Sequence, residues 1–252
     1  MGGGASMLWW PEAFCNQLAS NRRYVIRYDQ RDSGRSTKFG EGDARYTVDD
    51  LADDAMRILD GYEIPAAHLV GFSLGGVVAQ LAALEHPSRV RSLTVIETSP
   101  VGMDTSHLPP GGEAYRKHMA AAEEVDWSDR EQAIASTVEE SRVVAGTAHP
   151  FAEAQARKFI EEDYDRAGGF STLSNFSWQG GEKWHGRLHE MQAPLLVIHG
   201  TADPVYPIEH GIALSDAVPG AELIRLEGGG HELHEADWDT IIGAIVAHTR
   251  RE

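Results

Sequence analysis

The fold is decided by one stretch, Ala67-His68-Leu69-Val70-Gly71-Phe72-Ser73-Leu74-Gly75-Gly76. Its apolar first half predicts a buried strand, and the residues that follow Ser73 predict an amphipathic helix that ends at Glu85. Between them lies Gly-x-Ser-x-Gly, which is typical of a serine on a sharp strand-to-helix elbow with its Oγ exposed above a sheet. Glycine is required at Gly71 and Gly75 because a side chain there would collide with the neighbouring helix or strand. The stretch therefore predicts an α/β fold with Ser73 as a candidate nucleophile.

Strands and helices alternate on either side of this elbow. Further predicted strands lie at Tyr24–Tyr28, Ser92–Glu97, Pro194–Gly200 and Ala221–Leu226. Further predicted helices lie at Trp9–Ala19, Val48–Leu59, Ile208–Ala217 and Glu235–Thr249. Thr47 has the character of an N-cap for the helix that follows it. This alternation is typical of a mostly parallel sheet that helices cover on both faces.

The alternation stops at residues 100–190, where the pattern contains helices and loops but no convincing strand. Ser128-Asp129-Arg130-Glu131 has the form of a capping box that begins one helix, and Pro150 begins a second. An inserted helical segment of this kind usually lies over the carboxyl edge of the sheet, where ligands bind. We therefore expect a core formed by residues 1–99 and 191–252, with a helical cap at residues 100–190.

The composition limits the partners and the compartment. The formal net charge is −17 and the isoelectric point is near 5.1, so nucleic acid and anionic membrane surfaces are disfavoured as partners. Cys15 is the only cysteine, so no internal disulfide can form. The sequence has no apolar run of about 18 residues, and its opening lacks the basic and apolar regions of a signal peptide. We therefore expect a cytoplasmic protein that acts on a small molecule.

Two later residues complete a catalytic constellation with Ser73. Asp203 follows one buried strand directly, and His231 follows a glycine-rich loop after the last strand. A serine hydroxyl needs a nearby base, here His231, and an acid that orients the imidazole, here Asp203. The chain order Ser, Asp, His is that of serine hydrolases built on an α/β sheet. His234 could replace His231 as the base and Glu97 could replace Asp203 as the acid. The glycine run before His231 and the strand that delivers Asp203 favour the first assignment.

Acyl transfer also needs donors for the negative charge that develops on the carbonyl oxygen, and loss of one donor costs about 10²–10³ in rate. The backbone N–H of Leu74, in the first turn of the elbow helix, is one candidate. The second should come from a flexible loop, and the N–H of Gly3 in the opening Gly2-Gly3-Gly4-Ala5 run is the candidate there. Residues predicted to contact the substrate are Phe72, Trp127, Trp178 and Val205. We expect no metal and no organic cofactor, because this chemistry requires neither.

Along nearly its whole length the chain resembles the α/β-hydrolase superfamily, and within it the aclacinomycin methylesterase-like esterases. The shared stretches are residues 25–37, 67–76 and 247–250, together with the opening Met1-Gly2-Gly3-Gly4 and Trp10-Pro11. The resemblance implies a serine carboxylesterase that hydrolyses small, largely hydrophobic carboxylic esters through an acyl-enzyme. Lactone opening, C–C bond hydrolysis and perhydrolysis on the same triad stay open, as does a non-catalytic binding protein, because a fold does not specify a function.

The chain differs from this family at its beginning. Family members carry about three strands before the oxyanion loop, whereas this chain begins at the loop, so we expect an N-terminally truncated version of the family fold. A missing central strand with about five buried apolar residues, at about 1.5–3 kcal/mol each, represents about 7–15 kcal/mol of lost burial. That loss is comparable with the whole stability of a domain. Either the predicted strand at residues 24–28 pairs directly with the elbow strand, or another subunit covers the exposed edge of the sheet. We expect the second arrangement, a homo-oligomer.

Overall fold

The computed structural model describes residues 1–40, 43, 45–170 and 176–250. Four parallel strands form the main sheet in the order β2, β3, β5, β6, with bounds Ala67–Phe72, Val90–Ile96, Leu195–Gly200 and Glu222–Leu226. The predicted parallel sheet is therefore confirmed. Its strands end in register, because Phe72 pairs with Ile96 and Ile96 pairs with Ile198. Residues that directly follow these strands are brought together at one edge of the sheet.

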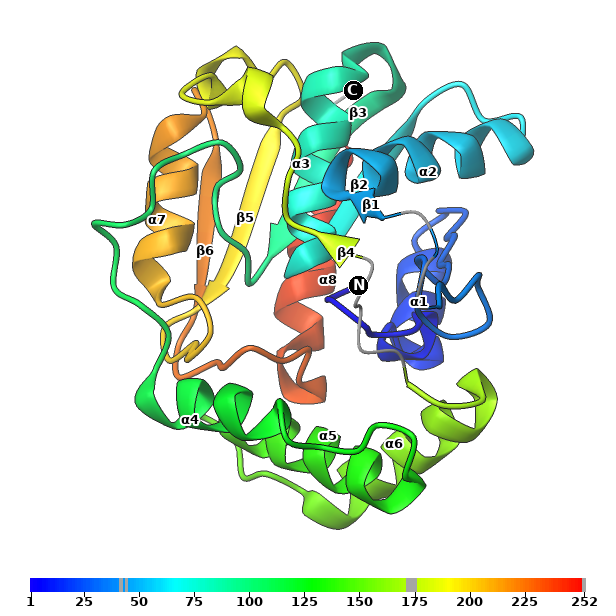
Figure 1. Ribbon diagram of the computed structural model, residues 1–252. Coiled ribbons are helices and arrows are strands. Elements are labelled where there is room, and N and C mark those ends of the chain that lie inside the picture. Colours follow the sequence, from blue (N-terminus) through cyan, green and yellow to red (C-terminus); the bar gives the residue numbers. More distant parts are fainter. Residues whose placement is uncertain (41–42, 44, 171–175, 251–252) are drawn as a thin grey trace.

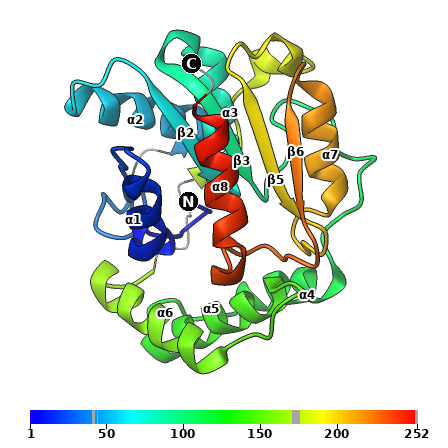
Figure 2. The ribbon, with the colours of Figure 1, turned by 180° about the vertical axis from the view of Figure 1, so that it is seen from behind.

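Helices cover both faces of this sheet (Figures 1 and 2). On one face pack α2 (Val48–Gly61), α3 (Leu74–Glu85) and α7 (Ile208–Ala217), and on the other pack α1 (Glu12–Ser20) and α8 (Trp238–His248). Alternate residues of a strand point to opposite faces. In β5, Val197 belongs to the first hydrophobic core, whereas Leu196 and Ile198 belong to the second. The sheet is therefore buried between two apolar layers, as its nearly continuous apolar strands predict.

Three further helices lie across the end of the sheet to which the strand arrows point (Figure 1). They are α4 (Glu113–Ala122), α5 (Arg130–Val144) and α6 (Glu153–Ala167), and we call them the cap helices. The N-cap of α5 is Asp129, one residue beyond the predicted Ser128, and its side chain accepts a hydrogen bond from the first turn. The division of the chain into core residues 1–99 and 191–252 and cap residues 100–190 stays a prediction.

Residues 24–28, predicted as a strand, form no strand in the structure. The backbone groups of an extended segment need a neighbouring strand, and no described strand pairs with this one. Side chains make contacts here instead. Arg23, just before the segment, donates to the Thr249 hydroxyl and to Val246 O at the end of α8, and Arg27 within it donates to Trp10 O. As a result β2 forms the edge of the described sheet, and Ala67–Val70 are only partly buried.

Two short strands carry no sequence signal. β1 (Tyr46–Thr47) pairs in parallel with β4 (Phe176–Ser177), so the interval 100–190 contains a strand, contrary to our expectation. Two residues are too few to show the alternation that reveals a strand. The other predicted helices and strands are present close to their expected bounds. Among the described helices, none has both the length and the apolar character needed to cross a bilayer.

Candidate active site

Ser73 occupies the turn between β2 and α3 with φ 52° and ψ −120°. A residue other than glycine in this region is strained, typically by about 1–3 kcal/mol. Two hydrogen bonds hold the strained turn: the Ser73 N–H donates to Ile96 O at 2.9 Å, and the Thr98 hydroxyl donates to Ser73 O at 2.8 Å. A Cβ on Gly71 would lie 2.1 Å from Gly75 O, so the predicted collision is with the first turn of α3. The elbow therefore holds Ser73 at the carboxyl edge of the sheet.

Asp203 and His231 meet at the same edge, where β5 and β6 end. His231 Nδ1 lies 2.9 Å from Asp203 Oδ2, and the N–H groups of Val205 and Tyr206 donate to Asp203 Oδ1 at 2.7 and 3.0 Å. Burial opposes ionisation of Asp203, but the charge of His231 and the hydrogen bonds from His199 and His231 outweigh it, so the pKa of Asp203 lies below its usual range. A carboxylate therefore faces the imidazole. Val205, predicted to contact the substrate, has its N–H directed at this carboxylate.

His231 lies beside the elbow. Its ring contacts the ring of Phe72, the residue before Ser73, with centroids 5.1 Å apart. Ser73 and His231 are partly exposed whereas Asp203 is buried, so a substrate can reach the first two. Among the described residues, the hydrogen bond of the His231 ring is the one from Nδ1 to Asp203, and none joins the ring to Ser73 Oγ. Catalytic hydrogen bonds are often long in an unliganded enzyme and shorten in the complex, and Nε2 is the ring nitrogen left to receive the Ser73 proton.

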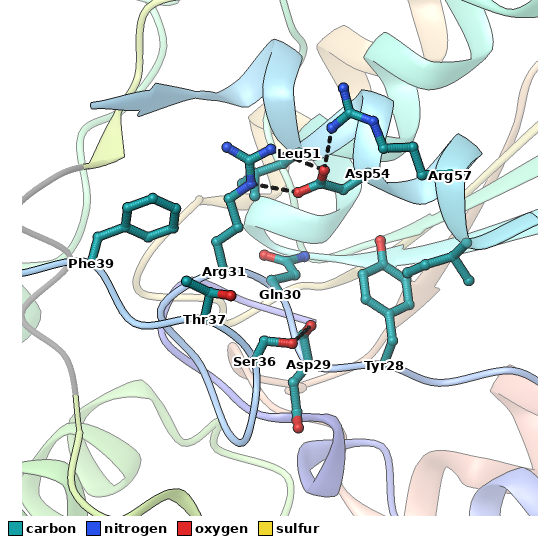
Figure 3. A pocket seen from close by; sticks show the side chains of 11 residues that line it. Tyr28, Asp29, Gln30, Arg31, Ser36, Thr37, Phe39, Leu51, Asp54 and Arg57 are labelled. Atoms are coloured by element: carbon teal, nitrogen blue, oxygen red, sulfur yellow. Dashed lines mark hydrogen bonds and ion pairs between the residues drawn. The ribbon is translucent and has the colours of Figure 1, made fainter. Parts of the chain in front are cut away.

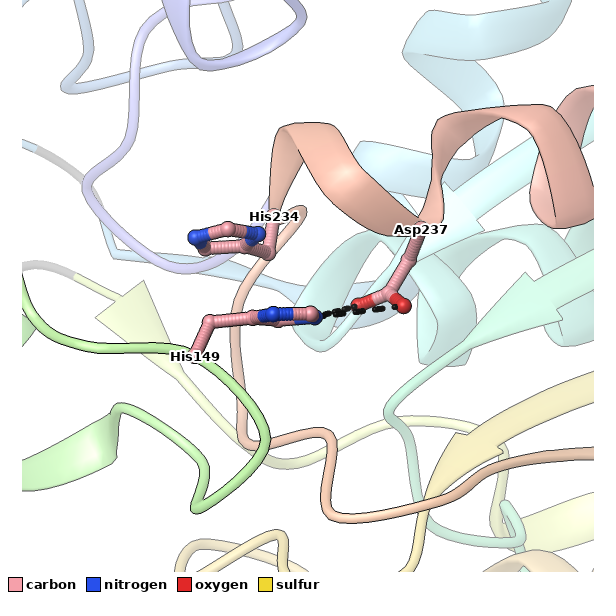
Figure 4. A group of neighbouring side chains, drawn as sticks. All are labelled: His149, His234 and Asp237. Atoms are coloured by element: carbon pink, nitrogen blue, oxygen red, sulfur yellow. Dashed lines mark hydrogen bonds and ion pairs between the residues drawn. The ribbon is translucent and has the colours of Figure 1, made fainter.

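His234, the alternative base, has its ring contact elsewhere. Its ring stacks on that of His149, with centroids 4.0 Å apart and planes at 12° (Figure 4). His149 Nε2 lies 3.4 Å from the Asp237 carboxylate, so this cluster joins the segment between α5 and α6 to the start of α8. The geometry therefore favours His231 as the partner of Asp203. His234 instead contacts His149, in the segment between α5 and α6.

Glu97, the alternative acid, lies beside Asp203. Its side chain is fully buried, its φ is 49°, and both carboxylate oxygens lie 3.0 Å from the Gly200 N–H. Ligand atoms of Glu97, Asp203 and His231 all lie within 4.8 Å of one another. Burial, and then the neighbouring Asp203, raise the pKa of Glu97 well above its usual value. Glu97 thus favours the neutral acid and Asp203 the carboxylate, which is the form that orients a histidine.

The opening residues of the chain lie against the elbow. Residues 2–5 form a turn in which the last N–H donates to the first carbonyl at 3.3 Å, and a Cβ on Gly2 would be 3.9 Å from Ser73 Oγ. The predicted donor Gly3 belongs to this turn. The predicted donor Leu74 is the first residue of α3, where N–H groups have no acceptor within the helix. The two predicted oxyanion donors therefore belong to the turn at residues 2–5 and to the first turn of α3, and their role stays a prediction.

Asp163 of α6 is a residue that sequence reasoning missed. Its carboxylate accepts the Ser6 hydroxyl at 2.5 Å and the Trp9 indole N–H at 2.9 Å, both from the opening segment. Ser6 and Asp163 are each 1% exposed. The sequence could have shown only that an acidic residue lies on the buried face of a predicted helix. It could not have identified Ser6, 157 positions away, as the partner of that residue.

The aromatic side chains predicted to contact the substrate make other contacts in the structure. Trp127 donates its indole N–H to Ala122 O at 3.3 Å, in the turn between α4 and α5. Trp178 is 61% exposed, and its ring lies 5.1 Å from that of Phe176. Phe72 is 5% exposed and packs in the core on the α8 side of the sheet. Contact of these side chains with a substrate stays a prediction.

A cavity of about 510 Å³ lies elsewhere, between residues 28–39 and α2 (Figure 3). Arg31 donates to both oxygens of Asp54 at 2.6 and 3.0 Å, and Arg57 donates to the same carboxylate at 2.7 Å. Neither Ser73 nor the acid–base pair is among the residues that line this cavity. These ion pairs join the loop after residue 28 to α2, and the cavity is separate from the proposed triad.

Three clusters in the described part of the chain bring cation-binding side chains within 4.8 Å of one another: His149, His234 and Asp237; Asp53, Glu85 and His86; and Glu97, Asp203 and His231. The third cluster is the acid–base site itself, where the hydrogen bond between His231 and Asp203 accounts for the close approach. Acyl transfer from a serine uses this pair without a metal ion.

Comparison with known proteins identifies the family. The family described as alpha/beta hydrolase fold matches residues 2–237. Rhodomycin D methylesterase DauP from Streptomyces sp. (strain C5) is 32% identical over an alignment of 265 positions, gaps included, that covers 99% of this chain and 89% of that protein. The esterase EaEST from Exiguobacterium antarcticum has a TM-score of 0.76 at 20% identity, with 99% and 90% of the two chains covered. The meta-cleavage product hydrolase CumD from Pseudomonas fluorescens IP01 has a TM-score of 0.71 at 20% identity, with 99% and 87% covered. The chain therefore belongs to the α/β-hydrolase fold family.

Proposed function

We propose that this chain is a serine carboxylesterase that hydrolyses small, largely hydrophobic esters through an acyl-enzyme. The observation that carries the proposal is the 2.9 Å contact between His231 Nδ1 and Asp203 Oδ2 beside the strained elbow of Ser73. Membership of the hydrolase family supports bond cleavage by water. The 32% identity to a methylesterase over 99% of the chain supports an ester as the substrate.

In the proposed mechanism Ser73 Oγ attacks the ester carbonyl carbon while His231 Nε2 accepts the hydroxyl proton. Asp203 holds Nδ1 and stabilises the imidazolium, and the N–H groups of Leu74 and Gly3 bind the oxyanion. The tetrahedral adduct collapses, the C–O bond to the alcohol breaks, and His231 protonates the leaving alkoxide. A water molecule then gives a proton to His231 and attacks the acyl-enzyme. The carboxylic acid leaves as Ser73 recovers its proton.

The substrate class is proposed at the level of the ester bond. The name of DauP describes a methylesterase, which supports methyl esters among the substrates to be tested. Lactone opening, perhydrolysis and C–C bond hydrolysis use the same triad, and they are the alternatives. The likeness to CumD, at 20% identity, is one of fold and does not carry its reaction to this chain.

Hydrolysis of p-nitrophenyl acetate, butyrate and octanoate tests the proposal. We expect Ser73→Ala to lose at least about 10³ of the rate. Ser141→Ala is the matched control, because that hydroxyl donates to Thr137 O within α5, and it should keep the full rate. The order of the three esters reports the length of the acyl group that the site accepts. If the unaltered chain is as inert as Ser73→Ala and a fluorophosphonate does not label it, the esterase proposal fails and a binding role becomes the better account.

We also propose that the chain self-associates through the edge of β2. That strand borders the described sheet, and Ala67–Val70 are only partly buried. Tyr24 and Tyr62 are 77% and 54% exposed, with ring centroids 6.3 Å apart. A second copy that packed against this edge would cover its partly exposed apolar surface. A light-scattering mass of one chain across a concentration series would contradict this proposal.

A further inference from the structure

The opening segment, residues 1–10, is held in place by side-chain contacts. In the described structure residues 1–6 belong to no helix or strand. The turn at residues 2–5 includes Gly4 with φ 69°, a left-handed conformation that favours glycine. The segment nevertheless lies against the elbow, since a Cβ on Gly2 would be 3.9 Å from Ser73 Oγ. Met1, before the turn, accepts a hydrogen bond from the Gln30 side chain at 3.3 Å. The residues that follow the turn make the further contacts that hold it.

Asp163 of α6 supplies the first of these contacts. One carboxylate oxygen accepts the Ser6 hydroxyl at 2.5 Å, and the other accepts the Trp9 indole N–H at 2.9 Å. The Trp9 ring also packs edge-on against Phe159 of the same helix, with centroids 5.0 Å apart. Asp163 is 1% exposed, so water cannot replace a lost donor. Breaking either hydrogen bond would leave a buried carboxylate oxygen without a partner and would destabilise the fold. Asp163 therefore attaches the residues after the turn to the cap.

Asp29 supplies the second contact, and Arg166 joins it to the same helix. Arg166 donates to both Asp29 oxygens at 3.2 and 2.7 Å, and Asp29 Oδ1 accepts the Met7 N–H at 2.7 Å. Burial opposes ionisation of Asp29, but Arg166 and the N–H groups of Arg35 and Met7 outweigh it, so the pKa of Asp29 lies below its usual range. A Cβ on Gly34 would lie 2.2 Å from Asp29 Cγ, so glycine at that position leaves room for the carboxylate.

We propose that Asp163 and Arg166 are positioning residues for the oxyanion hole, so that cap helix α6 sets the distance between the turn at residues 2–5 and Ser73. This inference rests on the proposed esterase function. Asp163 contacts the residues that follow the turn, and Arg166 holds the same residues through Asp29. This turn carries the proposed second oxyanion donor. A donor displaced by about 1 Å stabilises the transition state far less, and such a misplacement can cost about 10²-fold in rate. A change in the cap is thereby transmitted to the reaction centre, although neither residue touches the reacting atoms.

Asp163→Ala tests this inference against Asp165→Ala, a matched control two residues along α6. Asp165 is also paired with an arginine, Arg130 of α5 at 3.0 Å, but in an exposed ion pair within the cap. We expect Asp163→Ala to lower kcat about 10- to 100-fold with KM within about threefold, and Asp165→Ala to change neither.

A phenyl trifluoromethyl ketone supplies a second readout, because its adduct with the serine carries the oxyanion. Its affinity for Asp163→Ala should fall by the same factor as kcat, which a general loss of structure does not predict. Equal effects of the two substitutions, or a loss confined to KM, would overturn the proposal.

Hydrogen–deuterium exchange of residues 1–10 measures the attachment without catalysis. Faster exchange in Asp163→Ala than in Asp165→Ala supports the proposal, and unchanged exchange overturns it. Faster exchange combined with unaltered kcat and ketone affinity overturns the link to the oxyanion hole. If the unaltered chain is inert on esters, the proposed function fails, and exchange still decides whether Asp163 holds the segment. If Asp163→Ala does not fold, Ser6→Ala and Trp9→Phe each remove one hydrogen bond and take its place with the same readouts.

Discussion

The two sides of the candidate active site are held in different ways. Asp203 and His231 follow β5 and β6, two strands that pair in register up to Gly200 and Leu226, and they meet through one 2.9 Å hydrogen bond. The opening segment at residues 1–10 has no strand pairing in the described structure. A buried carboxylate on α6 and a partly buried one on the loop after residue 28 hold it. Backbone pairing positions one side, and side-chain contacts position the other.

This difference determines which substitutions should reach the site. A ladder of backbone hydrogen bonds does not depend on any single side chain, so substitutions near β5 and β6 should leave the acid–base pair in place. A segment held by the carboxylates of Asp163 and Asp29 depends on each of them. We therefore expect the acid–base side to be sensitive at the reacting groups themselves, and the oxyanion side to be sensitive to changes in the cap.

The largest expected effect is on the strand-held side. His231→Ala removes the proposed base and should lower kcat/KM by about 10⁴–10⁶, because the serine then has no proton acceptor. His234→Ala, three residues further on, is the matched control, since that ring stacks on His149, and it should keep at least about one tenth of the rate. Steady-state hydrolysis of p-nitrophenyl acetate measures both. A loss in His234→Ala as large as in His231→Ala would show that the base has been assigned to the wrong histidine.

The next effect is at the elbow between the two sides. Gly71→Ala would place a Cβ 2.1 Å from Gly75 O, and because the clash is with the backbone of α3 the elbow must move. We expect a loss of more than about 3 kcal/mol in the free energy of unfolding and of nearly all activity. Gly61 is the last residue of α2, and a Cβ there would have nothing within 4 Å. Gly61→Ala should therefore leave the free energy of unfolding unchanged or raise it slightly. Urea unfolding compares the two variants, and equal stabilities would mean that the elbow tolerates a side chain.

An intermediate effect concerns the proton on Glu97, beside the acid–base pair. Burial and Asp203 raise the pKa of Glu97 well above its usual value, so the folded chain holds a proton that the unfolded chain releases above about pH 4.3. This group therefore lowers stability as the pH rises from about 4.3 through the folded pKa. Glu97→Gln removes the effect, and its free energy of unfolding should fall less steeply with pH, by up to about 1.4 kcal/mol per pH unit.

Urea unfolding at several values between about pH 4.5 and 8 measures this difference in slope. Glu227→Gln, at an exposed position after β6, is the control and should follow the unaltered chain at every pH. Identical slopes for Glu97→Gln and the unaltered chain would mean that Glu97 is ionised in the folded protein.

The smallest expected effect is at the other contact between the cap side and the core. His149 pairs with Asp237 at 3.4 Å and stacks on His234, and all three side chains are partly exposed. Partly exposed ion pairs contribute about 0–1 kcal/mol, so His149→Ala should lower Tm by no more than about 3 °C and leave kcat within about twofold. Thermal unfolding and ester hydrolysis measure these values. If His149→Ala lowered kcat as much as Asp163→Ala, the contact of His149 would matter as much for catalysis as that of Asp163, contrary to our expectation.

Local patterns were sufficient for much of the fold. The elbow, the parallel strands and the helix that Thr47 caps follow from apolar periodicity, glycine spacing and capping residues, all of which act within a few positions. The strand predicted at residues 24–28 was wrong, because composition can favour an extended chain but pairing requires a neighbour that the described sheet does not supply. The pairing of β1 with β4 had no signal, since each strand has two residues.

Spacing along the chain suffices for the α/β class, for the position of Ser73 on its elbow, and for the order in which an acid and a histidine follow it. Only packing in three dimensions pairs Asp203 with His231, places Glu97 beside that acid, and brings Asp163 to Ser6. These contacts join residues far apart in the sequence, so their existence depends on how the cap helices and the sheet come together rather than on any local pattern.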